Sequence, residues 1–148
     1  MKNHGKLNNR LIGSAGEYFV AGELSRNGVV AALTRAGTDA FDILAVNRCG
    51  QQFAIQVKTT KDAKSTWLLG AKDEETRATH YVFVRLNGEE LPECYVVPAP
   101  EVAAAIRAGH QAWRKAKEGR TENGMREFQI AEHDPRYYRR WDYFQRED

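Results

Sequence analysis

The chain contains 148 residues, of which 22 are Lys or Arg and 20 are Asp or Glu, so its formal net charge is only +2. This balance excludes a protein that coats nucleic acid through charge alone, although it is compatible with local positive charge around an acidic site. The hydrophobic content is 42%, and no apolar run approaches the ~18 residues that would cross a bilayer. These properties predict one domain over residues 1–148, located in the cytoplasm and not bound to a membrane.

The first predicted element is a helix from about Asn9 to Asn27, after a loose polar leader at residues 1–8. Apolar and small residues recur there at the spacings of three and four that are typical of a helix: Ile12, Ala15, Phe19 and Gly22. Gly28 follows, at the position where many helices end.

Three successive strands are predicted at residues 29–34, 41–46 and 52–59, because apolar strand-forming residues dominate or alternate with other residues there. Arg48-Cys49-Gly50 lies between the second and third strands, and a three-residue hairpin loop favours a glycine in its last position. With this loop, residue 47 pairs with residue 51, and the same register places Asp42 opposite Gln56. Lys58 then lies two residues further along the same face.

Two more strands are predicted at residues 81–84 and 94–97, and residues 65–69 are a further candidate within an ambiguous segment. Pro100 is well placed to begin a helix that continues to Ala108, with Gly109 as its stop. Strands that follow one another through hairpins argue against a strictly alternating βαβ fold.

The last part of the sequence is polar and then aromatic. Residues 117–127 predict an exposed loop, and residues 128–148 form an aromatic and basic C-terminal element in which Asp134-Pro135 is a plausible helix start. Two interpretations of this element remain open. Its aromatic and arginine side chains could stack on bases and bind phosphates, or its aromatic face could pack on the domain.

Three polar residues on the predicted hairpin suit phosphodiester hydrolysis. That reaction needs oxygen ligands for a metal ion and a cation near the nucleophile or the developing negative charge. Asp42 offers a carboxylate, Gln56 offers an amide oxygen on the partner strand, and Lys58 offers the cation. Magnesium keeps several waters, so two or three protein oxygens suffice.

This arrangement resembles the PD-(D/E)xK nuclease superfamily, in particular archaeal Holliday-junction resolvases and their small relatives, in a QxK variant. Many members carry a glutamate on the first helix in a Gly-x-x-Gly-Glu setting, which Gly13 to Glu17 match here. The resemblance covers about residues 11–100. It implies a restriction-endonuclease-like α/β core, with a central mixed sheet of about five strands flanked by helices.

The resemblance also implies the activity, a Mg²⁺-dependent (or Mn²⁺-dependent) endonuclease that cuts DNA as a homodimer, without an organic cofactor. Glu17, Asp42 and Gln56 would hold the metal, and Lys58 would complete the catalytic set. One departure matters, because Gln56 stands where the superfamily has an acidic residue, and an amide binds magnesium more weakly than a carboxylate. The alternative is therefore a catalytically silent relative that binds nucleic acid or a protein partner.

Several weaker interpretations accompany this one. Asp39 competes with Asp42 for the same role, since Thr38-Asp39 can close a turn. Contacts to phosphates are candidate roles for three residues after the site, which a solvated loop explains equally well: Thr59, Lys61 and Lys64. A small α/β enzyme of another class, with the polar residues coincidental, is the third possibility.

Overall fold

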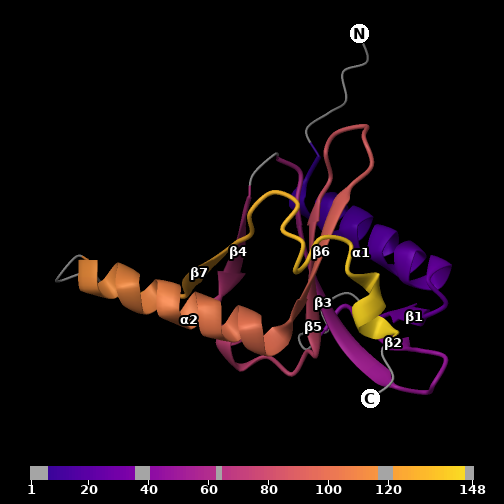
Figure 1. Ribbon diagram of the computed structural model, residues 1–148. Coiled ribbons are helices and arrows are strands. Elements are labelled where there is room, and N and C mark those ends of the chain that lie inside the picture. The colour runs from indigo at the N-terminus through magenta and orange to yellow at the C-terminus, as the bar shows by residue number, and fades with distance from the viewer. Residues whose placement is uncertain (1–6, 36–40, 63–64, 117–121, 146–148) are drawn as a thin grey trace, which may run out of the picture.

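The protein is an α/β structure in which a central mixed sheet is flanked by helices, as the sequence predicts (Figure 1). A computed structural model describes residues 7–35, 41–62, 65–116 and 122–145. The five-stranded sheet has the order β1-β2-β3-β5-β6, in which only β3 and β5 run parallel, and β4 and β7 form a second, two-stranded sheet. The elements are α1 (Asn9–Arg26), β1 (Val30–Leu33), β2 (Ile43–Val46), β3 (Gln52–Thr60), β4 (Thr66–Gly70), η1 (Ala71–Glu75), β5 (His80–Arg85), β6 (Glu93–Pro98), α2 (Ala99–Ala116), β7 (Met125–Gln129) and η2 (Trp141–Phe144).

The β2–β3 hairpin has the predicted register. Its ladder runs from Ile43 opposite Ile55 to Val46 opposite Gln52, and the Asn47 N–H donates to the Gln51 carbonyl at 3.0 Å. Gly50 has φ +82°, the left-handed conformation that the loop requires. The predicted three-residue loop is therefore confirmed.

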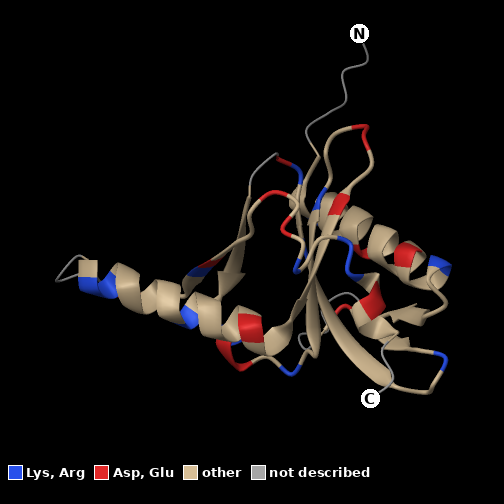
Figure 2. Ribbon diagram, in the orientation of Figure 1, with Lys and Arg blue, Asp and Glu red and all other residues tan. Residues whose placement is uncertain are grey.

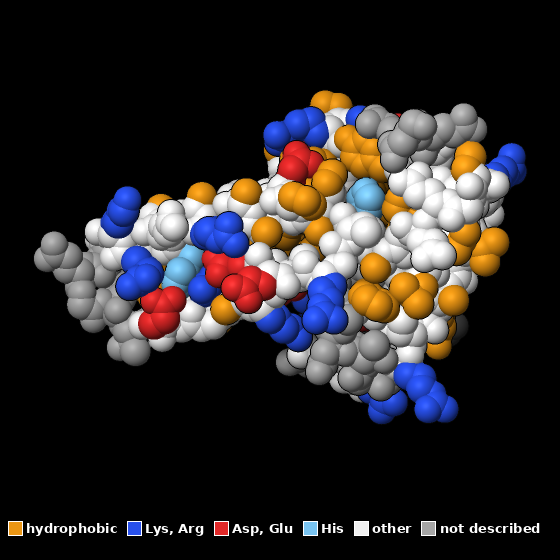
Figure 3. Space-filling view, turned by 90° about the horizontal axis from the view of Figure 1, so that it is seen from below, with side chains coloured by type: hydrophobic (Ala, Val, Ile, Leu, Met, Phe, Trp, Pro, Cys, Tyr) orange, Lys and Arg blue, Asp and Glu red, His pale blue; other side chains and the backbone are white. Residues whose placement is uncertain are grey.

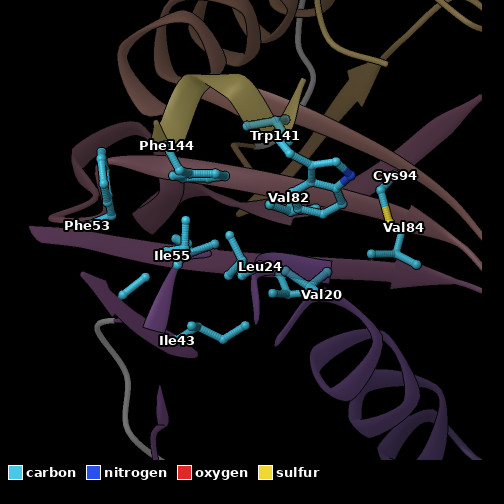
Figure 4. Close-up of a cluster of buried hydrophobic side chains, with 14 residues drawn as sticks. Val20, Leu24, Ile43, Phe53, Ile55, Val82, Val84, Cys94, Trp141 and Phe144 are labelled. Atoms are coloured by element: carbon cyan, nitrogen blue, oxygen red, sulfur yellow. The ribbon is translucent and has the colours of Figure 1, made fainter. Parts of the chain in front are cut away.

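Two hydrophobic cores lie on opposite faces of the central sheet. The first joins α1 and η2 to one face, and its buried side chains include Val20 and Leu24 from α1, Ile43 and Ile55 from the sheet, and Phe144 from η2 (Figure 4). The second core joins α2 and the β4–β7 sheet to the other face, with Trp67, Phe83, Ile106 and Phe128 among its members. The sheet is therefore covered on both faces.

Helix α2 and strand β7 differ from the prediction. Helix α2 does not stop at Gly109 but continues to Ala116, because it packs against β7 and one exposed glycine costs a helix only about 1 kcal/mol. The expected loop at 117–127 is in part strand β7, which is stabilised by pairing with β4. Both outcomes depend on tertiary contacts that local sequence preferences do not include.

The C-terminal segment is not the helix expected at Asp134-Pro135. Instead it pairs with strand β6, since the Val96 N–H donates to the Tyr137 carbonyl at 2.8 Å and the Arg139 N–H donates to the Cys94 carbonyl at 2.9 Å. Arg139 has φ +52°, which interrupts any helix. The segment then ends in the short helix η2, which closes the first core.

Charges of both signs are spread over the elements rather than gathered on one (Figure 2). Two basic residues, Arg114 and Lys115, lie in the last turn of α2. Among the described residues, no helix combines the length and apolarity that crossing a membrane requires.

Candidate active site

Helix α1 packs closely on strand β3 at Gly16. A Cβ atom at this position would overlap the side chain of Thr59, so only glycine permits the observed approach. The buried stripe of the helix consists of Ile12, Gly16, Val20 and Leu24. Glu17 follows Gly16 directly and is half-buried, so it lies next to the point of closest packing between α1 and β3.

Asp42 lies just before strand β2, where the regular ladder ends. Its N–H donates to the Ile55 carbonyl at 2.9 Å, and its Oδ2 accepts a hydrogen bond from the Val57 N–H at 2.8 Å. The carboxylate therefore accepts the β3 N–H in place of a backbone carbonyl of the neighbouring strand β2. Asp42 lies beside residues 55–57 as predicted, although it does not form a regular ladder pair with Gln56.

The carboxyls of Glu17 and Asp42 meet at this point. Burial, the nearby charge of Asp42 and a hydrogen bond between the two side chains raise the pKa of Glu17 from 4.5 to about 7. Two carboxylates in contact repel each other when both are ionised, and a proton or a cation between them relieves that repulsion. The structure thus joins two residues that are 25 positions apart in the sequence.

Gln56 and Lys58 extend the site along β3. Both side chains are half-buried, and they share the face opposite to the buried Ile55 and Val57. Through the parallel pairing of β3 with β5, Gln56 lies beside Tyr81. The four residues predicted from the sequence therefore come from three places: Glu17 from α1, Asp42 from the position just before β2, and Gln56 and Lys58 from the middle and second half of β3.

Sequence reasoning missed two residues at this site, Asp73 and Tyr81. Lys58 Nζ lies 3.7 Å from Asp73 Oδ2, and the Tyr81 hydroxyl donates to Asp73 Oδ1 at 2.6 Å. Burial, followed by the hydrogen bond to Asp73, raises the pKa of Tyr81, and the charge of Asp42 contributes as well. Asp73 stands in a polar run, Lys72 to Glu75, which gave no local signal of burial.

The residues predicted to contact phosphates have different positions. Lys61 is exposed just beyond β3, whereas Lys64 lies outside the described residues, as does Asp39. Thr59 Oγ1 is buried beneath α1 without a hydrogen-bond partner, so its hydroxyl does not face solvent.

The aromatic C-terminal side chains pack on the domain, which is the structural interpretation of the two left open. Tyr137 and Trp141 are each 7% exposed, and Phe144 is fully buried. The arginines of the segment remain nearer the surface, where Arg136 pairs with Asp134 at 2.8 Å.

A groove of about 580 Å³ between α2 and β7 contains none of these residues. One of its lining side chains, His110, is already paired, since its Nε2 atom lies 2.6 Å from Glu122 Oε1. Figure 3 shows histidine, acidic and basic side chains gathered on the arm of the molecule that contains α2 and β7. The groove is therefore separate from the candidate active site.

A second group of potential metal ligands, Glu93, Glu132 and His133, lies on the surface near β6. Glu93 is already paired with Arg85 at 3.1 Å and with His133 at 3.1 Å. The Arg85 cation neutralises this carboxylate, in contrast to the Glu17–Asp42 pair.

The α/β fold of this protein is shared with a solved nuclease structure. One solved structure that shares it is the bacterial homing endonuclease I-Ssp6803I, with a TM-score of 0.59, 11% sequence identity, and coverage of 95% of this chain and 94% of that chain. At this identity the similarity establishes the fold alone. No protein-family model matches the sequence, and the comparison with curated proteins also gives no match.

Proposed function

We propose that this protein is a metal-dependent DNA endonuclease of the PD-(D/E)xK type, in its QxK form. The observation that carries the proposal is the meeting of two carboxyls, from α1 and from the start of β2, beside an amide and an ammonium on β3. The arrangement matches the roles that the sequence motif assigns to Glu17, Asp42, Gln56 and Lys58. The shared fold with a homing endonuclease supports DNA as the substrate.

The donor set suits a hard divalent cation such as Mg²⁺ or Mn²⁺. Glu17 and Asp42 supply two carboxylates, Gln56 supplies an amide oxygen, and such ions prefer oxygen ligands. Burial and the charge of Asp42 disfavour the ionised form of Glu17 and so raise its pKa. A bound cation would favour that ionised form. When bound, the ion would supply Lewis-acid polarisation of the phosphate and activation of a water.

The protein's own residues would arrange the reaction around that ion. The Val57 N–H fixes the orientation of the Asp42 carboxylate, and the close contact at Gly16 fixes the position of Glu17. Lys58 would place its ammonium near the attacking water and the phosphate, where it stabilises the negative charge that develops there. By the same resemblance, we propose that the chain works as a homodimer, which suits the symmetric cutting of two strands.

The test is cleavage of labelled duplex, single-stranded and four-way-junction DNA, with Mg²⁺, with Mn²⁺ and with chelator. We expect metal-dependent cleavage by the wild-type protein and its loss in Asp42→Asn and Lys58→Ala. Lys115→Ala is the matched control, because Lys115 is an exposed lysine on α2 outside the site. It should cleave like the wild type.

A folded wild-type protein that cleaves none of these substrates would contradict the proposal. If it still bound DNA, and if Asp42→Asn bound equally well, the silent nuclease-fold alternative would be supported. Calorimetric titration with Mn²⁺ provides an independent measurement, since Asp42→Asn should lose the binding that the wild type shows.

A further inference from the structure

Asp73 is a buried carboxylate at the candidate site, and the sequence motif gives it no role. Its side chain is only 4% exposed, and Lys58 Nζ lies 3.7 Å from its Oδ2 atom. Within the described part of the chain, Lys58 is the one cation that pairs with it. A carboxylate removed from water needs such a partner, so the pair constrains both side chains.

The Asp73 carboxylate is itself held by two further donors. The Tyr81 hydroxyl donates to Oδ1 at 2.6 Å, and the Gly70 N–H donates to Oδ2 at 2.8 Å. Tyr81 is fully buried on strand β5, so its own position is fixed by the core. The orientation of the carboxylate is therefore set by groups other than Lys58.

Lys58 needs an external constraint because a lysine side chain is flexible along its four-carbon stem. The separation of 3.7 Å is longer than a direct hydrogen bond, so Asp73 restrains the ammonium without occupying all of its donors. The free N–H groups can still reach a water molecule or a phosphate oxygen. The pair thus limits where the ammonium lies and leaves it able to act.

We propose that Asp73 is the positioning residue for Lys58 and that the Tyr81 hydroxyl holds Asp73 in place for this purpose. This inference deepens the proposed function, since its consequence for cleavage rests on Lys58 acting in the reaction. The restraint of the lysine itself does not depend on nuclease activity. It can therefore be measured separately.

A purely structural role is the competing explanation. Asp73 also closes the turn from β4 into η1 through its bond to the Gly70 N–H. If that were its only role, losing the Tyr81 hydroxyl would lower stability and leave the environment of Lys58 unchanged. The experiment must therefore observe Lys58 directly.

The first measurement is the rate at which a small amine-reactive reagent acetylates Lys58 in the full chain. Mass spectrometry of the peptides from the reacted protein gives this rate for each lysine. Tyr81→Phe removes one hydroxyl from a buried ring, and Asp73→Asn removes the charge. We expect Lys58 to react severalfold faster in each variant, with the exposed Lys115 as the internal reference. Circular dichroism identifies the variants that remain folded, and Tyr81→Phe suffices if Asp73→Asn does not fold.

The second measurement is the cleavage rate constant at saturating DNA, together with the dissociation constant for DNA. A misplacement of about 1 Å can slow catalysis roughly 100-fold, and we expect Tyr81→Phe to be slower by roughly 10-fold with unchanged DNA affinity. Added to Lys58→Ala, the same substitution should cause no further loss, because it acts through the missing lysine.

Unchanged acetylation of Lys58 in a folded Tyr81→Phe protein would overturn the inference, whatever the nuclease assay shows. An additional rate loss from Tyr81→Phe in the Lys58→Ala background would also overturn it. Faster acetylation in a protein that never cleaves DNA would support the restraint of Lys58 and contradict only the proposed nuclease function.

Discussion

Replacement of Glu17 by glutamine should stabilise the protein at alkaline pH when no metal is present. The pKa of Glu17 is raised from 4.5 to about 7, first by burial and then by the charge of Asp42 and their mutual hydrogen bond. The native state therefore binds a proton more tightly than the unfolded state does. The contribution of Glu17 to the stability of the wild type must therefore fall as the pH rises from about 4.5 to about 7.

The size of this effect follows from the shift. At about 1.36 kcal/mol for each pKa unit, the full cost to the ionised native state would be about 3 kcal/mol. Glu17 is only half-buried, and solvent screening reduces the expected value to about 1 kcal/mol. Glutamine keeps the shape of the neutral acid and can still donate a hydrogen bond to Asp42. Glu17→Gln should therefore recover about 1 kcal/mol at pH 8, which corresponds to roughly 2–4 °C in Tm.

The assay is urea unfolding of the wild type and Glu17→Gln at pH 8 and pH 4.5, with chelator present. At pH 4.5 the difference between them should shrink to within about 0.5 kcal/mol, because Glu17 is largely protonated in the native wild type. Added Mg²⁺ should stabilise the wild type more than the variant, since a ligand that binds only the native state raises stability. A variant less stable than the wild type at pH 8, or an equal difference at both pH values, would refute the reasoning.

Two further predictions concern the helix packing at Gly16 and the protonation of His80. Gly16→Ala should lower the unfolding free energy by about 1–3 kcal/mol, because its methyl group would overlap Thr59, whereas Gly22→Ala, at an open position on the same helix, should raise it by about 0.5–1 kcal/mol. Urea unfolding measures both, and equal effects would contradict the close contact. The pKa of His80 is lowered by burial to about 4, so its unfolded state binds more protons and the wild type should lose stability as the pH falls below about 6.5. Between pH 7 and pH 5, the free energy of unfolding of the wild type should fall by about 2 kcal/mol more than that of His80→Phe. Parallel stability profiles of the two proteins would contradict this prediction.

The pH effects of Glu17 and His80 have opposite signs, which is why each needs its own variant. As the pH falls from about 7 to about 4.5, Glu17 gains a proton that favours the native state, while the unfolded state gains one at His80. The free energy of unfolding of the wild type, measured against pH, would show only the difference between the two effects.

Local sequence patterns determined much of the fold around the site. The spacing of apolar residues predicted α1, and the alternation after Gly50 predicted β3 together with the hairpin register. These features depend on the helical and strand periods and on the freedom of glycine in a turn, all of which are properties of neighbouring residues. The motif residues Asp42, Gln56 and Lys58 could be placed together because the hairpin links them through a short loop.

Only the tertiary structure decided the contacts between distant segments. The extension of α2 past Gly109 and the β4–β7 pairing arise from packing and strand partners remote in the sequence. The same holds for the Lys58–Asp73 contact, since Asp73 lies in a polar stretch whose burial no local pattern indicates. The chemical type of each side chain and the helical or strand period of a segment follow from the local sequence. Burial and the electrostatic environment of a side chain depend instead on which distant groups displace water from it.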